Sequence, residues 1–351
     1  MTETQVTDTP GHRLPAEWEP QDAVMIAWPH RDTDWAYMLE DIESTYDNLA
    51  LAILRFAKLV VVTPHSDYVS DRLLRLGCDM KRVAVVDAPT NDTWTRDYGP
   101  LTTLDADGNP TLNDFCFNGW GLKFAADRDN LVNRRLVFNG LLPGTYRNCL
   151  GFVLEGGSVE SDGQGTLLVT RDCLLSPNRN GGMTRREISA RLKSVLGAKK
   201  VLWLEHGALE GDDTDGHVDT LARLAPNNVV LYVGCQNPAD PHYDDLTNMK
   251  HDLRALRSAE GRPYSLVELP MAAAAYDEDG NRLPATYANF LIINGGILVP
   301  TYNHPKNDHL ACQIIQSVFP EHEVVPVDCR ALIRQHGSLH CATMQLHSIN
   351  F

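Results

Sequence analysis

The order of predicted secondary-structure elements repeats along this chain, and this repetition limits the available folds more than any other feature. A helix, a strand, a polar loop and a hairpin follow one another about every seventy residues, which gives roughly five units. No repeat is visible in the residues themselves, so only the order of elements recurs. Ordinary α/β domains also alternate helices and strands, so five similar units and one conventional α/β sheet both stay open.

Hydrophobic spacing defines the individual elements. Apolar residues recur at three and four positions over 41–58, which predicts a helix, and the β-branched run 59–64 predicts a buried strand. Gly-Gln-Gly, Pro-Asn-Asn and Gly-Gly turns predict hairpins over 152–170, 216–234 and 287–302. The same patterns predict the remaining elements, which are strands over 23–29, 82–88, 199–205, 265–270 and 323–328, and helices over 70–77, 184–197, 244–259 and 308–319.

Composition and charge exclude several classes of function. The chain is 43% hydrophobic, which is ample for a folded core, and its formal net charge of −15 disfavours a nucleic-acid or anionic-membrane partner. The same charge would attract a cationic small molecule. No apolar run approaches the roughly 18–20 residues of a membrane-spanning helix. The first residues are polar and lack a signal-peptide pattern.

The eight cysteines are scattered, with neither CxxC pairs nor a zinc-type cluster. Such usage suits a reducing compartment, so we expect a cytoplasmic protein without a bound metal. No linker-like composition divides the chain. We therefore expect a flexible arm over residues 1–13 and a single domain over 14–351, with a homodimer kept open as the assembly.

Four loops at the ends of predicted strands carry dense polar clusters, and such loops are where catalytic groups usually lie. They are DTWTRDYGP (92–100), LEGGS (154–158), GDDTDGHVD (211–219) and HGSLHC (336–341). Together they offer one thiol, one imidazole and three carboxylates: Cys341, His217, Asp97, Glu155 and Asp219. Two positions separate His217 from Asp219, so on an extended segment both side chains would point to the same face.

Several familiar kinds of site are excluded by these loops. The acidic loop 211–219 fails the calcium-loop template, and no GxSxG elbow, phosphate-binding loop or dinucleotide motif is present. A metal-dependent hydrolase that uses His217 and Asp219 stays open. A cysteine with a histidine indicates covalent catalysis, but nearby carboxylates would raise the thiol pKa unless a cation occupies the site. A planar guanidinium, whose N–H donors match paired carboxylates, is such a cation.

Six motifs in order resemble the agmatine deiminase and peptidyl-arginine deiminase family of guanidine-modifying enzymes. They are AWPHRDTDW, WTRDYGP, FNGWGLKF, EGG, DTDGHVD and GSLHC, and the resemblance runs from residue 14 to the C-terminus. It implies a five-bladed, pseudo-symmetric α/β propeller of the pentein type, with the site in its central channel. It also implies that no metal or organic cofactor is needed.

The resemblance implies a catalytic role for three residues. Cys341 would attack the guanidinium carbon as a thiolate. His217 would protonate the departing ammonia and then deprotonate the water that resolves the covalent thiouronium. Glu155 would keep His217 protonated and oriented.

It also implies a substrate-binding role for residues in the same loops. Asp97 and Asp219 would hold the guanidinium nitrogens. Trp94 and Trp120 either stack on the cation or wall the channel. Asp213 either meets the distal amine of the substrate or caps its own turn.

The expected activity is hydrolysis of a small guanidine, with agmatine converted to N-carbamoylputrescine and ammonia in polyamine (putrescine) biosynthesis. Deimination of arginine within peptides is the alternative that uses the same groups, and a non-catalytic ribosome-binding propeller is a third. One departure bears on the substrate, because typical agmatine deiminases carry Gly-Gly-Asn before Ile-His-Cys. This chain instead has His336, Gly337 and Ser338 before Leu-His-Cys.

Overall fold

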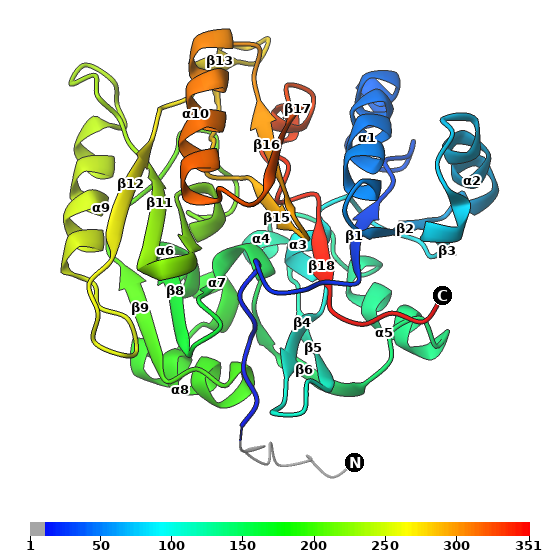
Figure 1. Ribbon diagram of the computed structural model, residues 1–351, viewed down its shortest axis with the longest axis horizontal. Coiled ribbons are helices and arrows are strands. Elements are labelled where there is room, and N and C mark those ends of the chain that lie inside the picture. Colours follow the sequence, from blue (N-terminus) through cyan, green and yellow to red (C-terminus); the bar gives the residue numbers. More distant parts are fainter. Residues whose placement is uncertain (1–10) are drawn as a thin grey trace.

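The computed structural model describes residues 11–351, and five of its sheets share one topology (Figure 1). In each, a first strand runs antiparallel to a second, which runs parallel to a third. The sheets are β4 (Leu101–Leu104), β5 (Pro110–Cys116) and β6 (Thr145–Val153); β7 (Glu160–Ser161), β8 (Thr166–Thr170) and β9 (Lys200–Leu204); β10 (Ala222–Ala225), β11 (Val229–Val233) and β12 (Ser265–Leu269); β15 (Leu291–Ile293), β16 (Gly296–Thr301) and β17 (Glu323–Asp328); and β18 (Met344–Leu346), β1 (Ala23–Ala27), β2 (Lys58–Thr63) and β3 (Val83–Asp87).

A helix connects the parallel second and third strands of every one of these sheets. In sheet order the connecting helices are α5 (Val132–Phe138), α8 (Arg185–Leu196), α9 (Tyr243–Ala255), α10 (Pro305–Val318) and α1 (Leu39–Leu54). Helix α2 (Ser66–Arg75) adds the fourth strand β3. The predicted recurrence is therefore present as β-β-α-β units in a mixed α/β fold. In Figure 1, α2, α5, α8 and α9 lie at the outer edge, whereas α3 (Thr95–Tyr98) and α4 (Gly119–Leu122) lie near the middle.

The remaining elements are short and lie in loops. They are the helices α6 (Arg171–Leu174) and α7 (Pro177–Asn180), the hairpin β13 (Ala275–Tyr276) and β14 (Arg282–Leu283), and the 3-10 turns η1 (Ala36–Met38), η2 (Met80–Arg82), η3 (Asp129–Leu131), η4 (Gly156–Ser158), η5 (Val218–Thr220), η6 (Pro226–Asn228) and η7 (Leu332–Gln335).

Local sequence signals set the ends of the longer helices. α8 begins with a capping box, in which Thr184 and Glu187 bond each other's backbone N–H groups. It ends at Gly197, whose φ of 69° is a conformation that glycine adopts at little cost. α10 has Pro305 in its first turn, where a missing N–H costs nothing. These signals place both helices within a few residues of their predicted positions.

The sequence patterns missed one unit and misplaced parts of others. Strands β4 and β5 and most of β6 were not predicted. The predicted hairpin 152–170 is formed by β7 and β8, and residues 152–153 instead end β6. Cys341 does not lie in a strand, because it occupies the turn that precedes β18. The errors have two causes. β4, β7 and β18 have two to four residues and are too short to show a hydrophobic period. β5 (PTLNDFC) and β6 (TYRNCLGFV) are longer, but their apolar and polar residues do not alternate regularly.

The predicted arm of residues 1–13 falls largely outside the described residues, which begin at 11. Within them, Arg13 pairs with Leu104 of β4 through two backbone hydrogen bonds, and its guanidinium forms an ion pair with Glu19. The end of the expected arm is therefore bonded to the first unit.

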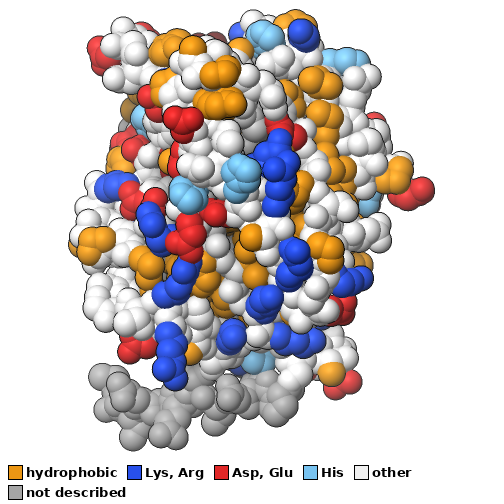
Figure 2. Space-filling view, turned by 90° about the vertical axis from the view of Figure 1, so that its left-hand side faces the viewer, with side chains coloured by type: hydrophobic (Ala, Val, Ile, Leu, Met, Phe, Trp, Pro, Cys, Tyr) orange, Lys and Arg blue, Asp and Glu red, His pale blue; other side chains and the backbone are white. Residues whose placement is uncertain are grey.

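The larger of two hydrophobic clusters draws side chains from all five sheets, including Met344, Leu101, Leu167, Leu231 and Leu298. No helix among the described residues is long and apolar enough to cross a membrane. Charge is distributed unevenly over the surface: Figure 2 shows Lys and Arg side chains gathered on the lower half of one face.

The loop before the first strand of each sheet is the feature that positions the site. These loops carry Asp97 before β4, Gly157 before β7, Asp219 before β10, Asn289 before β15 and Cys341 before β18. Hydrogen bonds join them directly: Gly157 N donates to Asp97 (3.1 Å), Asn289 donates to the carbonyl of Asp219 (3.3 Å), and Cys341 N donates to Asn289 (3.3 Å). Five topologically equivalent loops thus meet at one place.

Candidate active site

A narrow pocket opens where the loops meet, with about 420 Å³ of empty space when the open solvent at its mouth is included. Acidic, aromatic and thiol side chains line most of it: Asp34, Asp92, Trp94, Asp97, Trp120, Phe124, Asp213, Thr214, Gln335, His336, Gly337 and Cys341. Cys341, Asp97, Trp94, Trp120 and Asp213, all predicted as site residues, therefore border the same space.

His217, Asp97 and Asp219 converge on Gly157, which lacks a side chain. A Cβ atom built there would lie 2.6 Å from His217 Nδ1, 2.9 Å from Asp97 Oδ1 and 3.1 Å from Asp219 Oδ2. Because it has no side chain, Gly157 permits the close approach of these three groups. The prediction that His217 and Asp219 share an extended segment was wrong, because residues 218–220 form a 3-10 turn. The two side chains nevertheless face the same point.

Cys341 lies beneath the pocket with only 4% of its surface exposed. Its Sγ is 3.4 Å from Asn289 Oδ1 and 3.8 Å from Asp219 Oδ2. Burial raises the pKa of the thiol well above its ordinary value, and the negative charges of Asp219 and Asp97 raise it further. The expectation that neighbouring carboxylates disfavour the thiolate in an unoccupied site is therefore confirmed.

Asp97 is held by its neighbours in an orientation that faces His217. Its Oδ2 accepts a hydrogen bond from Trp120 Nε1 (2.8 Å), and its Oδ1 lies 3.5 Å from His217 Nδ1. Burial raises the pKa of Asp97 to about 6, although the charge on His217 opposes this. Trp120 adopts a left-handed backbone conformation, φ 54°, between two glycines. Such strain is typical of positions that must aim a side chain.

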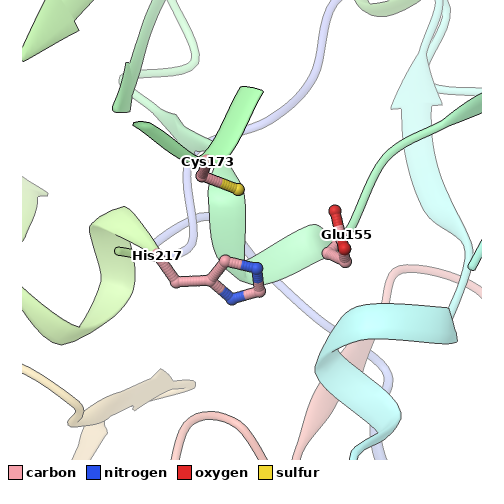
Figure 3. Close-up of side chains that lie close together, drawn as sticks. All are labelled: Glu155, Cys173 and His217. Atoms are coloured by element: carbon pink, nitrogen blue, oxygen red, sulfur yellow. The ribbon is translucent and has the colours of Figure 1, made fainter. Parts of the chain in front are cut away.

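His217 is fully buried, and burial alone would lower its pKa. Asp97, Cys173 and Glu155 outweigh burial and raise the pKa to about 10, so the ring is an imidazolium at neutral pH. Figure 3 shows the Glu155 and Cys173 side chains directed toward this ring. No hydrogen bond joins Glu155 to His217; the Glu155 carboxylate instead accepts from Arg179 Nε (2.9 and 3.1 Å). Glu155 therefore acts on His217 by charge across a short gap.

Glu155, Cys173 and His217 have ligand-type atoms within 4.8 Å of one another, so we tested them as a metal site. The test fails on the chemistry of the donors. The Arg179 guanidinium already occupies both oxygens of Glu155, and His217 carries a proton that a metal ligand must lose. For these reasons the group formed by Glu155, Cys173 and His217 does not suit a metal ion, and a site without metal ligands stays our prediction.

Other residues of the acidic loop 211–219 have structural roles. Asp212 accepts from Thr214 and Gly216 and so caps the turn. Asp215 pairs with Arg179 (2.6 Å) and Lys123 (2.7 Å). Asp213 and Thr214 are the residues of this loop that line the pocket.

The unusual segment 336–338 forms part of the pocket wall. His336 Nδ1 lies 2.7 Å from the carbonyl of Gly211, and its Nε2 is 3.9 Å from Asp213 Oδ2. A Cβ atom on Gly337 would overlap the Trp94 ring, so glycine is required there. The indole of Trp94 packs beside this backbone at the pocket edge.

Sequence reasoning missed Asn289 and Arg179. Arg179 was a lone basic residue in a polar stretch and carried no signal. Asn289 carried one, because it precedes β15 in the position that Asp97 and Asp219 occupy in their own units. An alignment of the repeating elements would have found it.

A mixed α/β fold whose loops bring a buried thiol, an imidazole and several carboxylates to one pocket defines the class as a guanidine-modifying hydrolase. A family model described as Porphyromonas-type peptidyl-arginine deiminase matches residues 13–346, and the chain belongs to this family. The resemblance read from the six motifs is thereby confirmed.

Individual relatives match over nearly their whole length. The agmatine deiminase of Stutzerimonas stutzeri is 35% identical, with 97% of this chain and 98% of the relative aligned. A crystal structure of a C. jejuni agmatine deiminase with substrate bound is 36% identical and superposes with a TM-score of 0.87 over 97% of this chain and 98% of that one. A Porphyromonas gingivalis structure classed provisionally as an arginine deiminase is 51% identical, with a TM-score of 0.88 over 96% and 98%.

Proposed function

We propose that the protein hydrolyses agmatine to N-carbamoylputrescine and ammonia. The observation that carries this proposal is the charge of the pocket: Asp34, Asp92, Asp97 and Asp213 line it, and no Lys or Arg of residues 11–351 does. Such a lining suits a substrate with two positive charges and no carboxylate. The relatives named agmatine deiminase, one of them with substrate bound, support the same reading.

In this proposal the substrate itself activates the nucleophile. Asp97 and Asp219 accept N–H bonds from the guanidinium and hold its carbon near Cys341 Sγ. The guanidinium charge offsets the two carboxylates that keep the thiol pKa high, so Cys341 loses its proton when the site is filled. The thiolate then attacks the guanidinium carbon.

His217 performs both proton transfers. As an imidazolium it donates a proton to the departing ammonia, and as a neutral imidazole it takes one from the water that cleaves the C–S bond. Glu155 favours the protonated ring by its charge, and Arg179 holds Glu155 in place.

Peptidyl-arginine deimination is the second candidate, and one observation favours it. The pocket adjoins a larger hollow, and the two share Asp34, Asp92, Trp120 and Phe124. A peptide extending from a bound arginine side chain would have room there. The acidic lining of both spaces suits such a peptide only where its neighbouring residues are neutral or basic.

We extend the proposal to the architecture. The five β-β-α-β units would form five blades of a propeller within a single domain over 14–351. The meeting of five equivalent loops at one pocket and a hydrophobic cluster shared by all five sheets support this arrangement. A homodimer and a cytoplasmic location stay predictions.

Ammonia release from agmatine, with the ureido product measured in parallel, tests the activity. Wild-type protein should give equal amounts of both products, and a strong chelator should not reduce the rate. Cys341→Ser should abolish turnover with the fold intact, because a hydroxyl is a far poorer nucleophile. Cys312→Ser, on α10, is the matched control. Measurable turnover by pure Cys341→Ser protein or loss with the chelator would contradict the mechanism.

A further inference from the structure

His340 lies directly behind the proposed nucleophile, with 2% of its surface exposed, and the mechanism above does not use it. Both ring nitrogens meet carboxylates. Nδ1 is 2.7 Å from Asp219 Oδ2, and Nε2 is 2.7 Å from Oε2 of Glu17, a residue near the start of the described chain. The imidazole thus bridges a proposed substrate-binding carboxylate and a carboxylate outside the pocket.

This bridge leaves the two oxygens of Asp219 in different states. Oδ2 is engaged by His340, whereas Oδ1 is buried and has no hydrogen-bond partner in residues 11–351. Asn289 accepts from the backbone N–H of His340 (2.9 Å) and donates to the Asp219 carbonyl (3.3 Å), so both backbones are held in register. A buried, unpartnered carboxylate oxygen is costly unless a ligand donates to it. Oδ1 is therefore the acceptor left free for a guanidinium N–H.

The groups around His340 are buried and mostly charged. Arg223 pairs with Glu160 (2.5 Å) and Glu17 (2.9 Å), and Arg96 approaches Glu17 (3.9 Å). Arg223 Nη2 also lies 3.1 Å from His340 Nε2, so this nitrogen meets both Glu17 and Arg223. Buried charge is tolerated when it is balanced and hydrogen-bonded. An imidazolium at His340 would give Asp219 and Glu17 a donor each.

We propose that His340 is a positioning residue: a buried imidazolium that ties Asp219 Oδ2 to Glu17 and so presents Asp219 Oδ1 to the substrate guanidinium. The inference rests on the proposed function, because it needs a guanidinium ligand. Burial would raise the pKa of Asp219, but the hydrogen bond and the charge of His340, together with the charges of His217 and Arg223, outweigh it. The pKa is therefore lowered, which agrees with an ionised clamp.

Two amide substitutions at His340 distinguish a role in positioning Asp219 from a general contribution to stability. His340→Asn places an amide nitrogen where Nδ1 lies and keeps the donor to Asp219, but it loses Glu17. His340→Gln places one near Nε2 and keeps Glu17, but it loses Asp219. In a Cys341→Ser background, which prevents turnover, agmatine binding is measured by calorimetry and unfolding by thermal melting, with exposed His251→Asn as the control. We expect His340→Gln to weaken agmatine roughly tenfold more than His340→Asn does, whatever the order of their melting temperatures.

Each outcome bears on the inference. Equal weakening of agmatine binding by both amides, or stronger weakening by His340→Asn, would overturn it. If neither variant folds, 15N NMR of histidine-labelled His217→Gln protein replaces them. One doubly protonated ring that shifts on agmatine addition is then expected, and its absence refutes the proposal. If wild-type protein releases no ammonia from agmatine and the Cys341→Ser protein does not bind it, the proposed function fails instead.

Discussion

At the scale of single residues, the site depends on charges that burial makes expensive. Cys341, His217, Asp97 and Asp219 are each no more than 4% exposed. Their protonation states depend on their surroundings: Asp97, Cys173 and Glu155 raise the pKa of His217, whereas burial and the charges of Asp219 and Asp97 raise the pKa of Cys341. A cation entering the pocket changes that balance more than it would in water, because the low local dielectric strengthens each interaction.

Alkylation rates should show this dependence on charge. At pH 7, 2-chloroacetamidine should alkylate Cys341 roughly tenfold or more faster than the neutral 2-chloroacetamide, since its amidinium satisfies Asp97 and Asp219 and favours the thiolate. The two reagents also differ in intrinsic reactivity, so their rates with a small free thiol are measured. The ratio of these rates is used to correct the ratio measured with the protein. Mass spectrometry of the intact protein follows both reactions. Equal corrected rates would mean that the carboxylates do not control the thiol.

Each carboxylate of the clamp should be needed separately. Asp97→Asn and Asp219→Asn each remove one charged acceptor from a desolvated site, which costs about 2–5 kcal/mol. The expected fall in kcat/KM for agmatine exceeds tenfold, and the exposed turn residue Asp279 provides a matched control as Asp279→Asn. If the kcat/KM of either variant stays within a factor of three of the wild-type value, that aspartate does not belong to the clamp.

Activity should peak between two titrations. Catalysis needs Asp97 ionised, and its pKa of about 6 means that kcat/KM rises as pH increases through that value. It also needs His217 protonated, and its pKa of about 10 means that kcat/KM falls as pH increases through that value. A bell-shaped profile with these limbs is expected. An activity loss already complete at pH 8 would show that His217 is not the acid.

At the scale of elements, each unit contributes one loop to the site, and the loop before β7 is the most tightly constrained. Its 3-10 turn η4 (Gly156–Ser158) places Gly157 against His217, Asp97 and Asp219. The adjoining loop before β10 is held by Arg179 of α7, which donates to the Thr214 carbonyl (2.8 Å). Hydrogen bonds between loops, more than contacts within each one, therefore determine the site geometry.

Gly157→Ala tests this constraint. The new methyl group would lie 2.6 Å from His217 Nδ1, so the imidazole or the turn must move. Because Gly157 does not have a positive φ, the backbone itself tolerates alanine, and the melting temperature should fall little. Agmatine turnover should fall roughly a hundredfold, since small misplacements of catalytic groups are costly. Gly151→Ala, whose Cβ would meet nothing within 4 Å, is the control, and full activity in Gly157→Ala would refute the packing argument.

At the scale of the whole molecule, the proposed function implies that charge selects the substrate. The formal net charge is −15, and no Lys or Arg of residues 11–351 is among the residues that line the pocket. Burial raises the pKa of Asp92 to about 7 and also raises that of Asp213. Such carboxylates gain most from a substrate ammonium that keeps them ionised.

A series of guanidines with different distal groups tests this selection through their kcat/KM values. We expect kcat/KM to decrease from agmatine to n-butylguanidine, which lacks the ammonium, and further to free arginine, whose carboxylate the pocket repels. Agmatine should exceed arginine by at least about tenfold, or roughly 1.4 kcal/mol. Comparable rates on arginine would show that the acidic lining does not act on the substrate's distal end. Faster turnover of blocked arginine peptides would favour the peptidyl activity.

The sequence by itself determined the α/β class, indicated a recurrence of roughly five units and supplied the candidate reactive groups. Cys341, His217, Glu155, Asp97 and Asp219 were found because a thiol, an imidazole and carboxylates in polar loops are rare enough to recognise. Spacing along the chain also located the helices, because a 3.6-residue period is visible over three or more turns. The unit over 101–153 was missed because β4 has only four residues and because apolar and polar residues do not alternate regularly in β5 and β6.

Only the tertiary structure decided how these groups share protons and which neighbours hold them. Asn289, Arg179 and His340 act on residues from 24 to 121 positions away, and hydrogen bonds between such distant residues leave no trace in local patterns. Protonation depends on burial and on the sum of nearby charges, and both exist only after the loops meet. The residue types in a sequence state which chemistry is available, whereas the folded arrangement fixes the charge that each group carries.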